Sequence, residues 1–453
     1  MRRLMLMISL LVLPGCFAGQ LAMPEFKGPS IWQNADKQND LYKETNAENL
    51  KNWWHGFNDP ALSALINKAL EANPDRLIAE ARILEARGLR RTARSSFFPQ
   101  ITGSADKGRD RGLFSGAADN FDARFDASYE IDLFGRVRKN ASAAQNSLDA
   151  AIAEYEYESL SLIAEVIRTY IEMRANEKQV IIAQENLEAQ LKTLELIQKL
   201  KEFGENPQLD VERAENVVNT TKASIPEFQR VSENARLRLA VLTGSVPEGL
   251  MDLAEGSGEI PGHDIAPILL APTKILALRP DIRAAFSNLK AQTDLAEVAV
   301  TDIFPTFTLS GFYGVAESGF ASTTQIWQVA IGAAATVLDF GGIAGQIDAA
   351  RAREKQAFET YRKTVLEAVN EVETALNDYA RINEQTFLLF KAFENADAAF
   401  DLSKTLYKEG EIAFLDVLDA QRTANDAESA LTTTEAARAF ALVRLYKSLG
   451  VGP

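Results

Sequence analysis

The chain contains very few histidines and cysteines, two residue types that often carry the chemistry of enzyme active sites. Its 453 residues include two histidines, His55 and His263, and a single cysteine, Cys16. The histidines lack a metal-ligand spacing, and the sequence has no cysteine pair, nucleophile elbow or phosphate-binding glycine loop. The many acidic residues are spread along helical sequence, where they are typical of solvated faces. The sequence therefore predicts a protein that is not an enzyme and that uses no metal or other cofactor.

The chain also has fewer basic residues than acidic ones. Lysine and arginine together number 48 against 63 aspartates and glutamates, so the net charge is −15 at neutral pH. Proteins that hold nucleic acid by counterion release need basic surfaces, so this charge excludes a nucleic-acid partner.

The apolar run at the N-terminus is shorter than the roughly 20 residues that a membrane-spanning helix needs. Arg2 and Arg3 precede apolar residues 4–13, which Ser9 alone interrupts. A basic start followed by a short apolar run is typical of a secretion signal. We therefore expect residues 1–15 to be a signal peptide.

The signal ends in Leu13-Pro14-Gly15-Cys16, which resembles a bacterial lipoprotein cleavage box. Pro14 departs from the usual alanine or serine. A lone cysteine directly after a leader nevertheless favours a covalent lipid on Cys16 over a free structural thiol. Phe17 is not the aspartate that retains many such lipoproteins in the inner membrane, so we expect a lipid anchor in the outer membrane.

Several short signatures recur in the chain at a constant spacing of 206 residues. They are Pro74-Asp75 and Pro280-Asp281, Phe98-Pro99 and Phe304-Pro305, Phe134-Gly135 and Phe340-Gly341, Gly204-Glu205 and Gly410-Glu411, Leu209-Asp210-Val211 and Leu415-Asp416-Val417, and Gly244 and Gly450. Chance agreement without one inserted residue is improbable, so the sequence predicts an internal duplication. We expect an N-terminal segment over 16–59, a first copy over 60–245, a connector rich in proline and glycine over 246–265, and a second copy over 266–451.

Each copy contains the pattern of a strand hairpin. Helical sequence ends at Pro99 and at Pro305, because proline removes a backbone donor. Strands are then expected at about 100–109 and 121–133 in the first copy, and at about 306–315 and 326–338 in the second. In 121–133 apolar and polar residues alternate with period two.

Two interpretations of these strands are open. They could be half-buried hairpins of a soluble sheet, or strands of an outer-membrane barrel, which need about 9 to 11 residues each. Four strands cannot close a barrel, so a membrane location requires several chains to share one. Two chains would give eight strands, and three would give twelve with room for a channel.

Long stretches without glycine or proline follow each strand hairpin. Residues 136–203 contain neither, and at about 1.5 Å per residue they could form a helix of roughly 100 Å. The chain then turns at FGENPQ and EGEIAF and returns, so helical hairpins are expected over 137–243 and 343–449. Pro226 is predicted to break the first return helix, whereas Thr432 at the corresponding place leaves the second unbroken.

Strand hairpins attached to long helical hairpins, duplicated within one chain, closely resemble the TolC/OprM family of outer-membrane efflux factors. The resemblance covers nearly the whole chain after the signal. Its motifs are NWWHGFNDPALSALINKAL, ASIPEFQRVSENARLRLAVLTG, LALRPDIRAAFSNLKAQ, IFPTFTLSGFYG and KEGEIAFLDVLDAQR. With the lipid box, they are similar to the OprM and NodT branch that serves resistance-nodulation-division pumps.

The resemblance implies an α+β membrane protein and a homotrimer. Twelve strands, four from each protomer, would form one transmembrane β-barrel that continues into a long α-helical barrel across the periplasm. The two helical turns would lie at the periplasmic tip, where an adaptor of the membrane fusion type docks and links the duct to an inner-membrane transporter. The expected adaptor contacts are Gly204, Glu205, Gly410, Glu411 and Ile412.

Charged residues just beyond the turns are candidates for a gate. Asp416 and Asp419 lie three residues apart, and the first copy has Asp210 and Arg213 at the corresponding positions. Carboxylates of this kind commonly form a solvated surface. Repeated around a threefold axis, however, they would form a ring that attracts cations, and the resemblance implies a constriction in this region.

The predicted function is passive export of drugs or other small toxic compounds through a duct that the adaptor opens. Three alternatives are a type I secretion outlet for polypeptides, a duct for metal ions, and a structural envelope protein with coiled helices. Beyond Met23 the only methionines are Met173 and Met251, too few for a methionine relay for copper or silver. The cargo does not follow from the sequence.

Overall fold

A computed structural model of the chain describes residues 31–36, 41–44, 50–111, 117–203, 207–250, 259–262, 265, 267–318 and 321–452. The predicted signal peptide, Cys16, Gly204, Glu205 and much of the connector lie outside these residues. The chain divides into two compact units. One contains Glu85–Asp149 and Phe286–Tyr361, and the other contains Pro29–Leu84, Ala150–Ala285 and Arg362–Pro453.

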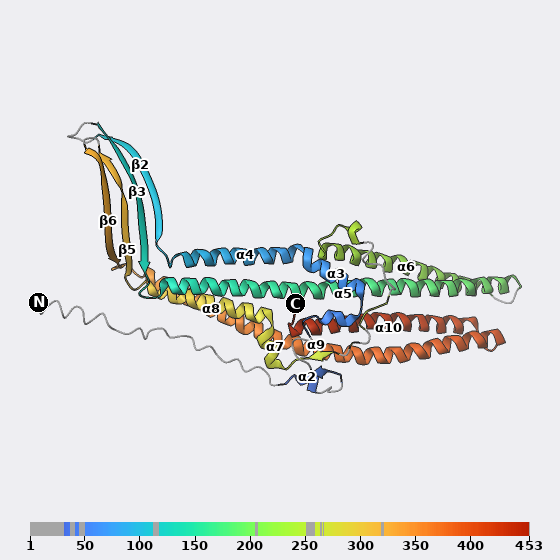
Figure 1. Cartoon of the computed structure of the whole chain (residues 1–453). Helices are drawn as coiled ribbons and strands as arrows, with labels where there is room; N and C mark the ends of the chain where they lie inside the picture. The colour runs from blue at the N-terminus through green and yellow to red at the C-terminus, as the bar shows by residue number, and fades with distance from the viewer. Residues whose placement is uncertain are drawn as a thin grey trace. The chain divides into compact units, whose positions relative to one another are not determined.

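The main helices and strands occur in two series with closely corresponding bounds (Figure 1). The first series is α3 (Pro60–Ala72), α4 (Pro74–Ser95), β2 (Gln100–Arg111), β3 (Ala117–Ile131), α5 (Arg136–Glu202) and α6 (Gln208–Leu242). The second is α7 (Pro272–Leu278), α8 (Pro280–Thr301), β5 (Thr306–Ser318), β6 (Ala321–Ala334), α9 (Gly342–Glu409) and α10 (Phe414–Leu449). From α4 onward, every element of the second series begins 206 residues after its counterpart, except β6, which begins two residues before that position.

Short polar residues begin the first two helices. The Asp59 carboxylate accepts a hydrogen bond from the N–H of Leu62 at 3.0 Å, with Pro60 at the first helical position of α3. The Asn73 side chain accepts one from the N–H of Arg76 at 3.0 Å and so caps α4. Both caps pair an oxygen with an N–H that has no partner within its own helix.

The strands form one antiparallel sheet in the order β2-β3-β5-β6 (Figure 1). The observed strands differ from the expected ones at six ends. β2 and β5 extend two and three residues further, and β3 and β6 begin four and five residues earlier. β3 ends at Ile131 rather than 133, because the Asp132 carboxylate turns to accept hydrogen bonds from the N–H groups of Val137 and Arg138 at the start of α5. β6 ends at Ala334 rather than 338, because the ladder with β5 ends there, at Thr306.

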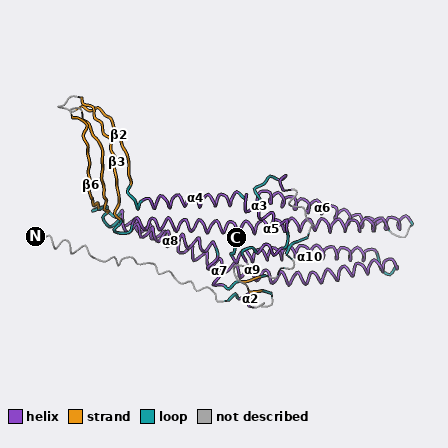
Figure 2. The backbone as a smooth tube through the Cα atoms, in the orientation of Figure 1, coloured by secondary structure: helices purple, strands orange, loops and turns teal. Residues whose placement is uncertain are grey.

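The two longest helices are α5, with 67 residues, and α9, with 68. At about 1.5 Å per residue each extends roughly 100 Å. Each reverses into a shorter helix, α6 or α10, and so forms a helical hairpin (Figure 2). Among the described helices, none combines the length and the apolar character needed to cross a bilayer.

The prediction that Pro226 breaks the first return helix is wrong, since α6 continues from Gln208 to Leu242 with Pro226 inside it. Proline removes only one hydrogen bond of this ladder, and Pro226 itself is exposed. The buried positions on either side share one helical face. They are Val211, Ala214 and Val218 before the proline and Ser232, Ala235 and Leu239 after it. Packing of this continuous face outweighs the local preference to stop.

The larger hydrophobic core lies in the second unit and includes the N-terminal segment. The indole N–H of Trp32 donates to the carbonyl of Leu270 at 2.8 Å, and Trp53 stacks on Tyr446 at 4.9 Å between ring centroids. A short parallel pair, β1 (Lys43–Glu44) with β4 (Ile268–Leu269), adds to this contact. The segment before α3 is therefore held against residues of the second copy.

Candidate functional site

The ends of the two helical hairpins pack on each other through a small hydrophobic cluster, here called the tip cluster. Its buried members are Ile197, Val211, Ala214, Phe414, Val417 and Leu418. They come from α5, α6 and α10, and the ring of Tyr407 from α9 lies 5.7 Å from that of Phe414. The four helix ends therefore form one packed unit.

Gly410 makes the turn between α9 and α10 possible. Its φ of 77° lies in the left-handed region, which a glycine adopts without steric cost. Its N–H donates to the carbonyl of Tyr407 at 3.0 Å, and the N–H of Glu411 donates to that of Leu406 at 3.0 Å, so the last carbonyls of α9 are paired. Gly410 and Glu411 are exposed, whereas Ile412 is half-buried against the tip cluster.

The charged residues predicted for the gate all lie on the first turns of α6 and α10. Asp416 and Asp419 are exposed, on the side of α10 away from Phe414 and Val417. One Asp416 oxygen accepts a hydrogen bond from the N–H of Ala413 at 3.0 Å and caps the helix. Asp419 pairs with Arg422 at 2.7 Å, an interaction that the i,i+3 spacing signals and that was not among the expectations above.

The corresponding pair in the first copy is internally neutral. Arg213 lies 3.4 Å from Asp210, again three residues apart on one helix. The Asp210 side chain is largely buried, whereas that of Arg213 is partly exposed. At the two tips Asp416 is thus the one of these four charged groups without an opposite charge paired to it by a described ion pair.

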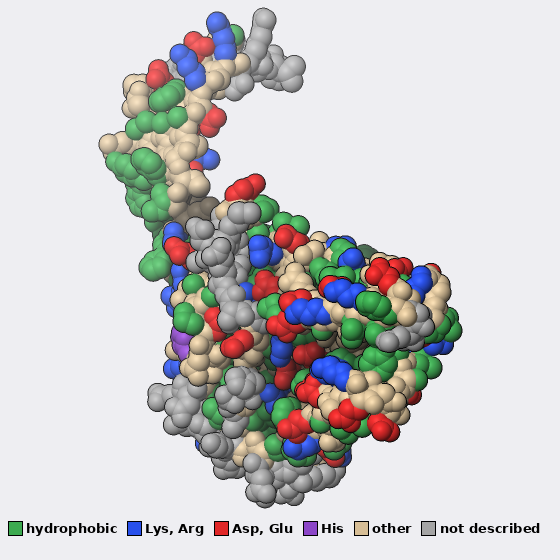
Figure 3. All heavy atoms as spheres, turned by 90° about the vertical axis from the view of Figure 1, so that its right-hand side faces the viewer, with side chains coloured by type: hydrophobic (Ala, Val, Ile, Leu, Met, Phe, Trp, Pro, Cys, Tyr) green, Lys and Arg blue, Asp and Glu red, His purple; other side chains and the backbone are tan. Residues whose placement is uncertain are grey.

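The sheet has an apolar face whose described side chains are exposed. Strand pairing aligns Phe125, Tyr313 and Trp327 in one row across three strands. In single-chain form these rings are exposed, with 72% of Trp327 accessible. Ile101, Val329 and Ile331 share this face and are also exposed, and Figure 3 shows hydrophobic side chains gathered on part of the sheet. The hypothesis of half-buried hairpins in a soluble sheet is not supported by so open a face.

The opposite face carries the charged residues of β3. Arg124 lies 3.1 Å from Asp126 and 4.0 Å from Asp122, so one positive charge is shared by two carboxylates and the group stays negative. In the neighbouring row Thr102, Asp126, Phe312 and Gln328 are aligned. One side of the sheet is therefore apolar and the other is mostly polar or small.

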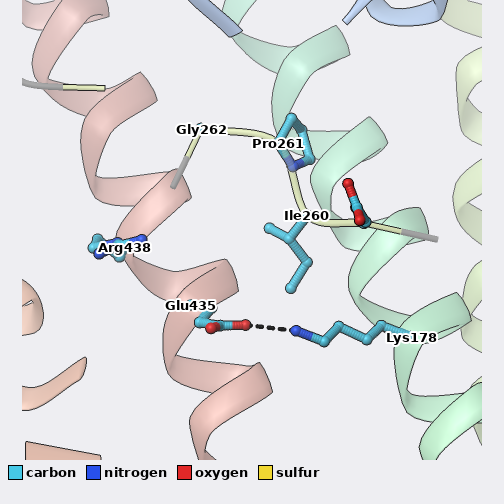
Figure 4. A pocket seen from close by; sticks show the side chains of 7 residues that line it. Lys178, Ile260, Pro261, Gly262, Glu435 and Arg438 are labelled. Atoms are coloured by element: carbon cyan, nitrogen blue, oxygen red, sulfur yellow. Dashed lines mark hydrogen bonds and ion pairs between the residues drawn. The ribbon is translucent and has the colours of Figure 1, made fainter. Parts of the chain in front are cut away.

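A cavity of about 220 Å³ lies beside α5 and α10 in the second unit. Lys178 and Glu435 form an ion pair of 2.8 Å across it, and Ile260, Pro261 and Gly262 of the connector line one wall (Figure 4). Its walls also carry Glu259 and Arg438. This cavity could not be predicted from the sequence, because its residues come from three distant segments.

Glu428 on α10 lies in an acidic environment. Burial, followed by the nearby carboxylates of Glu185 and Asp397, raises the pKa of Glu428 above its ordinary value. Lys178 acts in the opposite direction. The described residues contain no group of three or more His, Cys, Asp or Glu arranged to hold a metal ion.

Comparison with known families identifies this architecture. The family described as "Outer membrane efflux protein" matches residues 65–245 and again residues 271–451. The chain belongs to the outer membrane efflux protein family. Members of this family are transport channels rather than enzymes, and the resemblance to the TolC/OprM efflux factors is confirmed.

Individual relatives agree with the family. The chain is 29% identical over 414 residues to the pyoverdine export outer membrane protein OpmQ of Pseudomonas putida, covering 88% of each chain. It is 25% identical over 456 residues to the cation efflux system protein CusC of Escherichia coli, covering 97% of this chain and 98% of CusC. The solved structure of the outer-membrane channel OprN has a TM-score of 0.88 at 32% identity, covering 94% of this chain and 97% of OprN. This efflux family member is therefore an outer-membrane protein with the general role of an efflux channel.

Proposed function

We propose that the chain is the outer-membrane duct of a tripartite pump of the resistance-nodulation-division type. Three chains would share one closed sheet of twelve strands, and the helical hairpins would continue the passage into the periplasm. The observation that carries this proposal is the sheet, whose apolar face is exposed and whose edge strands β2 and β6 are open in one chain. An open edge in lipid leaves backbone groups unpaired, so several chains have to close the sheet together.

Internal duplication explains how one chain can supply repeated parts of such a ring. The family matches twice, and both the starts and the ends of the two matches, at 65 and 271 and at 245 and 451, are 206 residues apart. The starts of α5 and α9 have the same spacing. Three chains would then place six similar units around the axis.

The described ion pairs single out Asp416 among the proposed gate residues. Asp419 is partnered by Arg422, and Asp210 by Arg213, so among these four residues Asp416 would contribute the unpaired negative charge at a closed tip. The variant D416N/D419N keeps side chains of similar shape, and it should change the single-channel conductance and reduce cation preference. D401N on α9, which removes an exposed pairing with Lys404, is the control. Unchanged conductance in D416N/D419N would count against the gate.

The proposed partners are a periplasmic adaptor at the hairpin tips and an inner-membrane transporter that supplies the energy. Exposed Gly410 and Glu411 are suited to contact, and Ile412 supports the turn from beneath; Gly204 and Glu205 are proposed as their first-copy equivalents. A photo-crosslinking amino acid at Glu411 should capture the adaptor in intact envelopes. The same probe at Glu384, on an exposed part of α9, should not. Equal capture at both positions would overturn the tip assignment.

Cys16 is proposed to carry a covalent lipid. The mass of the mature protein should equal that of residues 16–453 with acyl groups attached, and C16A should lose that added mass. A mature chain that begins at Met1 and has no added mass would contradict this proposal.

The cargo is proposed only as small compounds. OpmQ is named for pyoverdine and CusC for cations, and both align with nearly the whole of this chain. The alignments therefore do not choose between these cargoes. Met173 is fully buried in the core and cannot offer its thioether to a channel, which disfavours a methionine relay. Pull-down of the transporter, followed by accumulation assays with its substrates, tests the class of cargo. Capture of a transporter for polypeptides would instead favour the secretion outlet.

A further inference from the structure

The two edge strands of the sheet, β2 and β6, are the counterparts of two strands that already pair within one chain, β5 and β3. In one chain β3 of the first copy pairs with β5 of the second copy. The outer strands β6 and β2 are the counterparts of β3 and β5 in the opposite copies. If several chains close one sheet, as proposed above, β6 of one chain has to pair with β2 of the next. A head-to-tail pairing of this kind generates a ring.

The two hairpins have the same internal register, which allows the missing register to be inferred. Gln100 is opposite Ser128 in the first hairpin, and their counterparts Thr306 and Ala334 are opposite each other in the second. Apart from a bulge near Ala316, this correspondence holds along the hairpin. The two copies are therefore interchangeable as pairing units.

The junction between β3 and β5 then predicts the junction between chains. Ile131 is opposite Phe307, and Ala127 is opposite Gly311. Moving each residue to its counterpart in the other copy places Val337 opposite Ile101 and Ala333 opposite Ala105. Val337 and Ile101 are both largely exposed in one chain, at 94% and 69%.

This pairing also explains the early end of β6. The sequence predicts a strand to 338, whereas β6 ends at Ala334. The counterpart of Ala334 in the first copy is Ser128. β3 extends three residues beyond Ser128, to Ile131, where it pairs with β5. The residues after Ala334 would gain the same pairing from β2 of the next chain.

An aromatic contact at the base of the sheet follows the same rule. Phe134 of the first copy stacks on Phe304 of the second, with ring centroids 4.6 Å apart and planes at 14°. Their counterparts are Phe340 and Phe98, which are 93% and 72% exposed. Phe98 and Phe304 occupy equivalent turns, because their N–H groups donate to the carbonyls of Ser95 and Thr301 at 3.0 Å in both cases.

The backbone at Phe340 departs from this equivalence. Its φ of 54° is left-handed, a conformation that costs a residue other than glycine about 1 kcal/mol or more. A stacked aromatic partner contributes a free energy of similar size, about 0.5 to 1.5 kcal/mol.

We propose the register of the junction at which β6 of one chain meets β2 of the next: Val337 lies opposite Ile101, and Phe340 stacks on Phe98. The partner is a second copy of this chain. The proposal rests on the shared sheet of the proposed function, and it adds the register and the residues of the junction.

Cysteine pairs test the register directly. The double variant A105C/A333C should give disulfide-linked bands of two and three chains on gels without reductant, since directly opposite residues have Cα atoms within disulfide range. A105C/I331C and A105C/A335C, each displaced by two residues, should link far less. A123C/V315C joins residues that are opposite within one chain and should remain a single-chain band. The single variants A105C and A333C report any linkage through Cys16.

The outcomes separate this proposal from the function on which it rests. Preferential linkage in A105C/A333C supports the register. Preferential linkage in either displaced pair overturns the register and leaves the duct intact. So does the absence of linkage under oxidising conditions in a sample that conducts in planar bilayers. A sample that neither assembles nor conducts overturns both.

The aromatic contact has its own readout. F98A and F340A should each lower the temperature at which the oligomer dissociates, and the double variant should lower it hardly further than the larger single effect, because the two rings share one contact. F134A, which removes the contact inside one chain, is the matched control and should couple to F304A in the same way. Fully additive effects of F98A and F340A would contradict the stacking.

Discussion

Gly450 lies so close to Arg279 that a side chain at Gly450 has no room. A Cβ at Gly450 would be 2.2 Å from Cγ of Arg279, and the glycine has a φ of 71°. The buried Arg279 guanidinium donates to the Ser448 carbonyl at 2.7 Å. It also pairs with Asp281 at 2.7 Å and with Glu371 at 2.8 Å. The end of α10 is thereby joined to the junction of α7 and α8 and to α9.

The first copy makes the same connection with a smaller residue. Asn73, the counterpart of Arg279, donates from its side chain to the carbonyl of Leu242 at 3.0 Å, and Leu242 is the counterpart of Ser448. Gly244 has a φ of 60°, and a Cβ there would be 2.2 Å from the carbonyl oxygen of Ala72. Both hairpins are therefore closed at the same point, and only the second uses an ion-pair network.

R279A should lower the free energy of unfolding by about 3 to 5 kcal/mol, because it leaves Asp281 without its buried cation. R283A, which removes a more exposed pairing with Glu156, should cost about 1 kcal/mol or less. Denaturant unfolding followed by circular dichroism measures both. Equal losses would show that the Arg279 network adds no stability beyond a surface pair.

G450A should destabilise the protein more than G410A. Both glycines have left-handed φ values, so alanine costs about 1 kcal/mol at either position. Only at Gly450 would the new Cβ also clash, since no atom lies within 4 Å of a Cβ at Gly410. Overpacking should add about 1 to 3 kcal/mol, and thermal unfolding compares the two variants. A smaller loss for G450A would mean that the close contact with Arg279 is easily relieved.

P226A should stabilise the protein by up to about 3 kcal/mol, because alanine restores an N–H to an exposed helix interior. T432P makes the reverse change at the corresponding, buried position of α10 and should destabilise by at least that amount. Melting temperatures of the two variants test the pair. No gain in P226A would indicate that the proline serves the assembled protein.

Glu428 should make stability depend on pH. Its pKa is higher in the folded chain than in the unfolded chain, so folding takes up protons, and the free energy of unfolding falls as pH rises through the interval between the two values. E428Q should remove this fall and be more stable than the wild type at neutral pH. E188Q is the control. Lys192 lowers the pKa of the exposed Glu188, so this residue makes the free energy of unfolding rise, not fall, with pH. A fall of equal size in the wild type and E428Q would assign the dependence to other groups.

Local sequence patterns predicted the long helices and the strand hairpins because each depends on periodicity and on a few turn residues. Residues 136–203 lack any helix breaker and form α5 almost to the residue. The alternation in 121–133 gave the position of β3 to within a few residues. Pro226 was misjudged because the packing of α6 outweighs a local preference.

Other features depend on contacts between distant segments, which the sequence does not display. Arg279 lies in the motif LALRPDIRAAFSNLKAQ, which gives no sign of its network, because its partners lie up to 169 residues away. The gate stays a proposal, and the ion pair of Asp419 with Arg422 limits it in a way that only the i,i+3 spacing of the sequence signals. The end of β6 differs from the expected one for a further reason, since we infer that the missing partner strand belongs to another chain.

The central claim is that this chain assembles into a conducting duct. Full-length protein, extracted from outer membranes in detergent, should insert into planar lipid bilayers and give discrete single-channel steps, with a conductance that D416N/D419N changes. Oligomeric, folded protein that never raises the conductance of the bilayer above that of empty detergent would contradict the account.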